Sequence, residues 1–432
     1  MASVRVYNAT LMTMAPGFEP VSPGELVAGD GTIEYVGPQR GNHSGTWDTE
    51  IDAADGVLIP GLVNAHTHLA MTLLRGYADD MPLHEWLTTK IWPTEARLTE
   101  DDVYWGAMLG ILEMLRGGTT CFSDMYHFFN AGTRAAIDGG MRALPSGVLL
   151  QLAEEASSVQ MAVEFALQVR QDAPSRIVPM LGPHAPYSCT DGMLEEVAQA
   201  AREHNLGIHI HLSETFDEVE QVIAASGLRP VHYLDELGVL ENTVAAAHCI
   251  YVDDAELEVL IEKQVGIVHC PTSAMKLGSG YARIPEMLAG GARLGLGTDG
   301  CASNNRLDML QEARMAALMH KGYTGDPALI KAEEALHMAT VGSAETLGLG
   351  EQIGTLEVGK RADFTIISLD AAHNQPLHNV CSQLIYAVEA ADVVCTAVDG
   401  VVLYHNGEYP HLDAEHIIAR ANECARRLVN SQ

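Results

Sequence analysis

The stretch "PGLVNAHTHLAMTLLRG", Pro60 to Gly76, ends an apolar run with two histidines one residue apart. On a β-strand, residues i and i+2 point to the same side, about 6.5–7 Å apart. His66 and His68 would therefore project side by side from the end of a strand. Two hydrogen-bonded polar residues in a loop would explain an isolated His-x-His pair equally well. The choice depends on which other side chains reach the same place.

Eight short apolar runs alternate with helical patterns through the middle of the chain. The strands predicted from them are residues 57–64, 118–125, 142–150, 177–184, 206–214, 243–249, 266–271 and 293–300. Between 103 and 116, for example, apolar residues recur with helical spacing. Eight β units, each followed by an α unit, predict an α/β protein with a (β/α)₈ TIM barrel. A doubly wound open sheet is the alternative, but polar residues at the carboxyl ends of at least five strands favour the barrel.

Both ends of the chain are rich in β-like runs separated by turn signals. These signals are Asp30-Gly31, Asp55-Gly56, Asp399-Gly400 and Asn406-Gly407. Neither end has enough strands to be stable alone, so we expect residues 1–57 and 358–432 to form one small β-sandwich domain. The tail from about Ala414 is predicted to be helical. Residues 58–357 would then form the catalytic barrel.

Composition and charge exclude several classes of partner. The chain of 432 residues is 47% hydrophobic and 19% charged, as expected of a soluble globular protein. Its formal charge of −32 repels phosphate backbones and anionic lipids, so neither nucleic acid nor a membrane is expected as a partner. No export signal is recognised at the N-terminus, and the protein is predicted to be cytoplasmic. Assembly into a homo-oligomer is compatible with the sequence.

Further ligand-type residues follow other predicted strands. His211 and Glu214 follow the fifth strand, His248 the sixth and Asp299 the eighth. The carboxyl ends of all eight barrel strands meet at one rim, where barrel active sites lie. Three neutral imidazoles and one carboxylate, with a position left for water, would suit a catalytic divalent metal ion such as Zn²⁺.

These motifs resemble the amidohydrolase superfamily, and in particular its 5′-methylthioadenosine/S-adenosylhomocysteine deaminase branch. The resemblance rests on the first stretch quoted above together with "HLSET", "AAHC" and "LGTDGCASNNRLDM", and "WPTE" and "GPHAPYSC" point to the branch. It implies one divalent metal ion per chain, Zn²⁺ being expected, held by His66, His68, His211 and Asp299. Relatives with two metals use a carboxylated lysine at the end of the fourth strand. Here "IVPMLGPHAPYS" contains no lysine, so a single ion is predicted.

The resemblance also implies a reaction, the hydrolytic deamination of a 6-aminopurine nucleoside. A bound Zn²⁺ ion lowers the pKa of water to roughly 7. We expect Asp299 to take the proton of the water, His248 to orient the attacking oxygen, and Glu214 to carry protons to the ring nitrogen and the leaving amine. A simpler hypothesis makes Glu214 a cap of the following helix.

Three residues match the substrate-binding positions of the branch, where Glu214 and Asp299 also face the substrate. Glu95 matches the carboxylate that binds the ribose hydroxyls, His184 a purine or ribose contact, and Trp86 an aromatic wall. Without the resemblance they would be interpreted as a surface charge, a polar strand end and a core aromatic. His209 shares the face of His211 and is predicted to lie deeper in the barrel, not to be a ligand.

The substrate is predicted to be 5′-methylthioadenosine, converted to 5′-methylthioinosine and ammonia, in preference to S-adenosylhomocysteine. Deaminases that accept the second substrate well hold its carboxylate with an arginine that follows the third strand. Residues 149–165 contain no Arg or Lys, and Glu154 and Glu155 would repel a carboxylate. Arg170 and Arg176 come later. An arginine from a neighbouring subunit would overturn the preference. Ala274 also departs from the branch, where Asn is common.

Other readings keep the metal ion and change the substrate to adenosine, a free purine base such as guanine or 8-oxoguanine, or a triazine. Glu95 argues against the last two, because neither carries a ribose. A non-catalytic nucleoside-binding protein is the remaining alternative.

Overall fold

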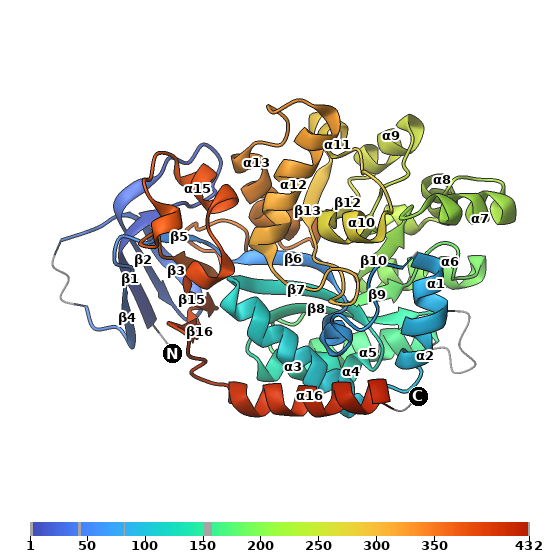
Figure 1. The fold of residues 1–432 in the computed structure, drawn as a ribbon, viewed down its shortest axis with the longest axis horizontal. Coiled ribbons are helices and arrows are strands. Elements are labelled where there is room, and N and C mark those ends of the chain that lie inside the picture. The colour runs from blue at the N-terminus through green and yellow to red at the C-terminus, as the bar shows by residue number, and fades with distance from the viewer. Residues whose placement is uncertain (1–2, 42–44, 82, 151–157, 431–432) are drawn as a thin grey trace.

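The computed structural model describes residues 3–41, 45–81, 83–150 and 158–430. Its strands form two separate eight-stranded sheets (Figure 1). One is built from the middle of the chain and the other from both ends. The prediction of a barrel with an added β domain is therefore confirmed, while the exact domain bounds remain a prediction.

The first of these sheets is a parallel barrel in which neighbours along the chain are neighbours in space. Its strands are β6 (Leu62–Thr67), β7 (Thr119–Tyr126), β8 (Arg142–Leu149), β9 (Met180–Pro183), β10 (Gly207–Leu212), β11 (Val244–His248), β12 (Gly266–His269) and β13 (Arg293–Leu296). Almost all of their residues are buried, because parallel strands covered by helices have no solvent face.

The barrel closes between its first and last strands through residues beside the predicted ligands. The Asp299 N–H donates to the His66 carbonyl at 3.0 Å, and the Thr298 N–H donates to Asn64 Oδ1 at 3.0 Å. Asn64 Nδ2 donates in return to Thr298 Oγ1 at 2.8 Å. His66 and Asp299, 233 positions apart in the sequence, are thus joined directly by the seam.

Helices follow every strand of the barrel. They are η1 (Leu69–Leu74), α1 (Leu83–Trp86), η2 (Leu87–Ile91), α2 (Trp92–Glu95), α3 (Glu100–Arg116), α4 (Phe129–Asp138), α5 (Val159–Asp172), α6 (Asp191–His204), α7 (Phe216–Ser226), α8 (Pro230–Glu236), η3 (Val239–Glu241), α9 (Asp254–Glu262), α10 (Pro271–Leu277), α11 (Ile284–Ala289), α12 (Met309–Thr324), α13 (Ala332–His337), η4 (Met338–Gly342) and α14 (Ser343–Thr346). The predicted helix over 103–116 is α3, which begins earlier because Thr99 and Asp102 form a capping box.

The second sheet joins the two ends of the chain in the order β16-β15-β14-β5-β1-β2-β3, with β4 beside β1. Its strands are β1 (Ser3–Leu11), β2 (Val21–Gly29), β3 (Thr32–Pro38), β4 (Thr49–Asp52), β5 (Val57–Pro60), β14 (Phe364–Ile367), β15 (Val393–Val398) and β16 (Val401–His405). Their apolar side chains form a core cluster separate from that of the barrel. Neither end could bury this surface alone, as predicted.

The turn signals of this sheet have different outcomes. Asp30-Gly31 and Asp399-Gly400 close hairpins β2–β3 and β15–β16, and all four residues have positive φ, as tight two-residue turns require. Asn406-Gly407 closes a turn beyond β16. Asp55-Gly56 is not a hairpin, because β4 and β5 both pair with β1 in parallel.

The strand predicted over 57–64 is wrong, because the chain leaves one sheet and enters the other at Gly61. β5 belongs to the terminal sheet and β6 to the barrel. A Cβ atom at Gly61 would lie 2.1 Å from Thr120 Oγ1, so only glycine fits this crossing. An unbroken apolar run hid the change of sheet.

Three short helices, η5 (Ala372–Asn374), α15 (Val380–Tyr386) and η6 (Ala390–Asp392), connect β14 to β15. The predicted tail helix, α16 (Ala414–Asn430), packs along α3 on the outside of the barrel (Figure 1). Within the described ranges, every helix is too short or too polar to cross a bilayer.

Candidate active site

Four predicted ligand side chains converge at the carboxyl end of the barrel. Asp299 Oδ1 lies 3.4 Å from His66 Nε2 and 3.3 Å from His68 Nε2, and His68 Nε2 lies 3.2 Å from His211 Nε2. These atoms come from β6, the segment after it, β10 and the loop after β13. His66, His68 and Asp299 each offer an atom within 4.8 Å of the others, so these three side chains could hold one ion, with His211 adjacent to His68.

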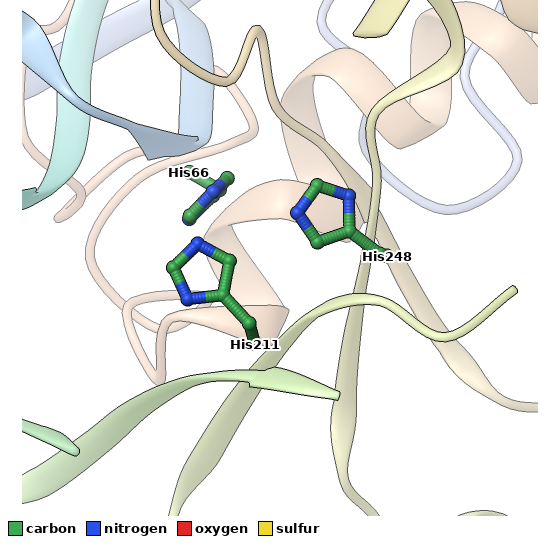
Figure 2. A group of neighbouring side chains, drawn as sticks. All are labelled: His66, His211 and His248. Atoms are coloured by element: carbon green, nitrogen blue, oxygen red, sulfur yellow. The ribbon is translucent and has the colours of Figure 1, made fainter. Parts of the chain in front are cut away.

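His248 at the end of β11 reaches the same space. Ring nitrogens of His66, His211 and His248 lie within 4.8 Å of one another, and Figure 2 shows the three rings facing a common centre. The backbone of His248 has a φ of 75°, a left-handed conformation that is rare outside glycine. The site therefore holds a fourth imidazole that could bind an ion directly or orient a water molecule.

The second nitrogen of each predicted ligand histidine is engaged, which fixes the ring. His68 Nδ1 donates to the Met125 carbonyl at 2.6 Å, and His211 Nδ1 donates to the His184 carbonyl at 2.8 Å. A proton on Nδ1 leaves the electron pair on Nε2, the atom that faces the centre. Both rings are thus held in the tautomer that binds metal ions.

His66 is held by another histidine, His209, one layer deeper. His66 Nδ1 lies 2.7 Å from His209 Nε2, and His209 Nδ1 lies 3.1 Å and 3.3 Å from the hydroxyls of Ser123 and Ser146. His209 is fully buried. The sequence placed it below the ligands but gave no sign of this contact.

Two serines that sequence reasoning missed hold the carboxylate of Asp299. Ser273 and Ser303 each donate a hydroxyl hydrogen bond of 2.6 Å to Asp299 Oδ2. Both serines are buried, and the backbone of Asp299 has a φ of 60°. Oδ2 is occupied in this way, so Oδ1 faces the imidazoles. The "PTS" motif after the seventh predicted strand was the available signal.

The charges of the cluster favour one positive charge at its centre. Burial lowers the pKa of His66 to about 4 and that of His211 well below its usual value, so both imidazoles are neutral electron donors. Burial opposes the proton on His68 too, but Asp299 outweighs it and raises the pKa of His68 to about 9. The two imidazoles hold the pKa of Asp299 well below its usual value in spite of its burial.

The donor set fits a divalent metal ion. His66 Nε2 is a buried nitrogen without a hydrogen-bond partner among the described residues, which is costly unless an ion is its partner. Three imidazole nitrogens and one carboxylate oxygen are ligands that Zn²⁺ prefers.

Glu214 lies at the edge of this cluster, beside His248. Its Oε2 is 3.8 Å from His248 Nε2, and burial raises the pKa of its carboxyl group. Its backbone is fixed by Glu218, whose carboxylate accepts hydrogen bonds from the Ser213 and Glu214 N–H groups at 2.8 Å each. Thr215, not Glu214, caps α7, so the capping hypothesis is wrong.

A cavity of about 730 Å³ opens above the cluster and is lined by Trp86, Glu95 and His184 as well as Glu214. Its volume lies within the usual range for small-molecule sites. Trp86 is buried, and His184 Nδ1 shares a 2.8 Å hydrogen bond with Ser188. The structure thus brings the predicted substrate residues to one cavity, while their roles remain predictions.

The charged residues on which the predicted substrate preference rests lie in different parts of the structure. Glu154 and Glu155 fall outside the described residues. Arg170 donates to the carbonyls at the end of α6, those of His204 and of Asn205 just beyond it. Arg176 lies near Arg142 and Asp399, toward the terminal sheet. Neither arginine lines the cavity.

Comparisons with known proteins agree with this geometry. The amidohydrolase family pattern matches residues 57–403. The chain is 46% identical over 95% of its length to a protein of Moorella thermoacetica named 5-methylthioadenosine/S-adenosylhomocysteine deaminase, covering 97% of that protein. It is 42% identical to a 5′-deoxyadenosine deaminase of Methanosarcina mazei, over 99% of each chain. An adenosine deaminase of Xanthomonas campestris, solved with bound zinc, superposes with a TM-score of 0.94 at 35% identity over 99% of each chain.

Proposed function

Because the chain belongs to the amidohydrolase family, as its motifs suggested, we propose that it is a metal-dependent deaminase of 6-aminopurine nucleosides. Its preferred substrate is 5′-methylthioadenosine, which water converts to 5′-methylthioinosine and ammonia. Zn²⁺ is the proposed ion, one per chain, bound by His66, His68, His211 and Asp299.

One observation carries this proposal: a single cavity is lined by part of the imidazole–carboxylate cluster, by the half-buried Glu214 beside His248, and by Glu95. The cluster alone would suit many hydrolases. Glu95 supplies an acceptor for ribose hydroxyls, which a free purine base or a triazine lacks. The relatives named for methylthioadenosine and deoxyadenosine support a nucleoside as the substrate.

The residues of the chain divide the chemistry among them. When bound, the metal ion makes water acidic enough to ionise near neutral pH. Asp299 accepts the proton of the water, and the hydroxyls of Ser273 and Ser303 keep its carboxylate in place. His248 orients the attacking oxygen toward C6 of the purine.

Glu214 moves protons on the substrate side. Its raised pKa allows the carboxyl group to carry a proton, which it gives to the ring nitrogen beside C6 as the oxygen adds. The Glu214 carboxylate then takes the proton of the hydroxyl group now on C6 and passes it to the amino group, which leaves as ammonia. The proton held by Asp299 returns to Glu214, which restores both carboxyl groups. The oxygen of water has replaced the amine, and the C6–N bond is the one broken.

The cavity favours a neutral group at the 5′ position. Apart from the imidazoles of the predicted metal site, the charged side chains among its described lining residues are the carboxylates of Glu95, Glu100, Glu214 and Asp299, with no Lys or Arg. Its outer part is apolar, with Trp92, Phe128 and Tyr187 at the opening. A methylthio group suits these walls, whereas the carboxylate of S-adenosylhomocysteine would find no cation there.

An ammonia-release screen tests the proposal. Methylthioadenosine, S-adenosylhomocysteine, adenosine, guanine and a triazine would be compared by kcat/KM. We expect the highest value for methylthioadenosine and none for guanine or the triazine. A higher value for S-adenosylhomocysteine would contradict the proposed preference, and activity on guanine or the triazine alone would contradict the proposed class of substrate.

A further inference from the structure

We propose that Tyr126 is a positioning residue that holds Glu95 in place for the recognition of the ribose. The proposal rests on the proposed function, since it concerns how the same cavity binds a nucleoside. Tyr126 is the last residue of β7, and Glu95 is the last residue of α2. The Tyr126 hydroxyl donates a 2.7 Å hydrogen bond to Glu95 Oε1.

This bond is built into the wall of the cavity. Tyr126 is 4% exposed and packs in a cluster with Trp86 and Met71, whereas Glu95 is only half-buried. Burial, with the nearby charge of Glu95, raises the pKa of Tyr126 well above its usual value. The phenol therefore stays protonated at every working pH and can only donate to the carboxylate.

The hydrogen bond from Tyr126 leaves enough acceptor positions on the Glu95 carboxylate to bind the two ribose hydroxyls. An ionised carboxylate has about four lone-pair positions, and Tyr126 uses one of them on Oε1. The others can accept from two neighbouring hydroxyl groups, which is what a ribose offers. A carboxylate on the short helix α2 would otherwise be free to rotate toward solvent.

The same strand end also holds a metal ligand. The carbonyl of Met125, the residue before Tyr126, accepts the hydrogen bond from His68 Nδ1 at 2.6 Å. Two consecutive residues of β7 thus fix His68 and Glu95. His68 beside the reacting centre and Glu95 beside the ribose are thus both hydrogen-bonded to the end of β7. The rigid strand therefore sets the distance between them.

A simpler explanation is that a buried phenol needs some hydrogen-bond partner and Glu95 happens to serve. The two explanations differ in what Tyr126→Phe would do. The substitution keeps the ring and its packing but removes the hydroxyl, so a packing role survives it and a positioning role does not.

The test compares adenosine with 2′,3′-dideoxyadenosine, which differ only in the two ribose hydroxyls. For Tyr126→Phe we expect KM for adenosine to rise about tenfold with kcat within about threefold, the signature of lost binding. KM for the dideoxy substrate, which has no ribose hydroxyl group to donate to Glu95, should change less than about twofold. Glu95→Gln should abolish most of the preference for adenosine, and adding Tyr126→Phe should then have little further effect.

Tyr104→Phe is the matched control, because Tyr104 donates a similar 2.9 Å bond to Asp138 on the outside of the barrel. This control should leave KM and kcat for both substrates unchanged. The zinc content of all variants should equal that of the wild type. Equal losses for both substrates, or no loss for adenosine, would overturn the role of Tyr126. Calorimetry measures the ratio of the two binding affinities without turnover. If the enzyme proved inactive, the proposed function would be contradicted, and the binding ratio would still test the role of Tyr126.

Discussion

Two clusters of buried charged and polar groups lie at opposite ends of the barrel, and they differ in whether their hydrogen bonds are complete. At the amino end of β8, Arg142 donates to Asp363 Oδ2 at 2.7 Å and Oδ1 at 3.0 Å, and to Asp399 Oδ1 at 2.6 Å. Arg361 donates to the same oxygen of Asp399 at 2.6 Å. Each of these four side chains has a partner of opposite charge.

The cluster at the carboxyl end has the opposite character. His66 Nε2 lacks a hydrogen-bond partner in the described part of the chain, and Asp299 Oδ1 lies 3.4 Å from that nitrogen and 3.3 Å from His68 Nε2. The first cluster joins the barrel to the terminal sheet and is complete within the protein. The second could be completed by a cation. The two clusters thus differ in whether the protein alone supplies their partners.

Replacing Glu214 with Gln should have the largest effect and should act on chemistry alone. Gln cannot carry a proton, so kcat should fall by roughly 10²–10⁴-fold, the usual contribution of a general acid–base group. Zinc content and thermal stability should stay at the wild-type values. Turnover within about fivefold of the wild type would remove Glu214 from the mechanism.

Replacing Arg142 with Met breaks the complete cluster and should act on stability instead. It leaves the buried carboxylate of Asp363 without its cation and Asp399 with Arg361 alone, and breaking a buried ion pair costs about 3–5 kcal/mol. Denaturant unfolding measures the loss, and the folded fraction should keep its zinc and its kcat. Arg361→Met, at a partly exposed position, should cost less. An equal loss from the two variants would contradict the comparison.

Replacing Ser273 with Ala should have the smallest effect, through one hydrogen bond to Asp299. Removing a partner of a metal ligand typically weakens metal binding 10–100-fold. Competition with a zinc-binding dye should show this weakening, while activity at saturating zinc should recover most of the wild-type value. Unchanged zinc affinity would show that Ser303 alone suffices to hold the carboxylate.

Much of this organisation could be predicted from the sequence, for reasons that specific residues show. The eight apolar runs follow simple periodicity, so the barrel was accessible, and the strand-end histidines and Asp299 could be expected at one rim. Their role as metal ligands comes from the family resemblance and stays a prediction. Gly61 was not, because a change of sheet leaves an apolar run unbroken. Nor were Tyr126, Ser273 and His209, whose roles depend on side-chain contacts between segments far apart in the sequence.

The most direct test of the central claim is the metal content of the folded protein. Elemental analysis after exhaustive dialysis should give one zinc ion per chain for the wild type. The variants His66→Ala and Asp299→Ala should remain folded and contain almost none, and chelation should abolish activity until zinc is restored. Two tightly bound ions per chain, or full activity without any, would contradict the account.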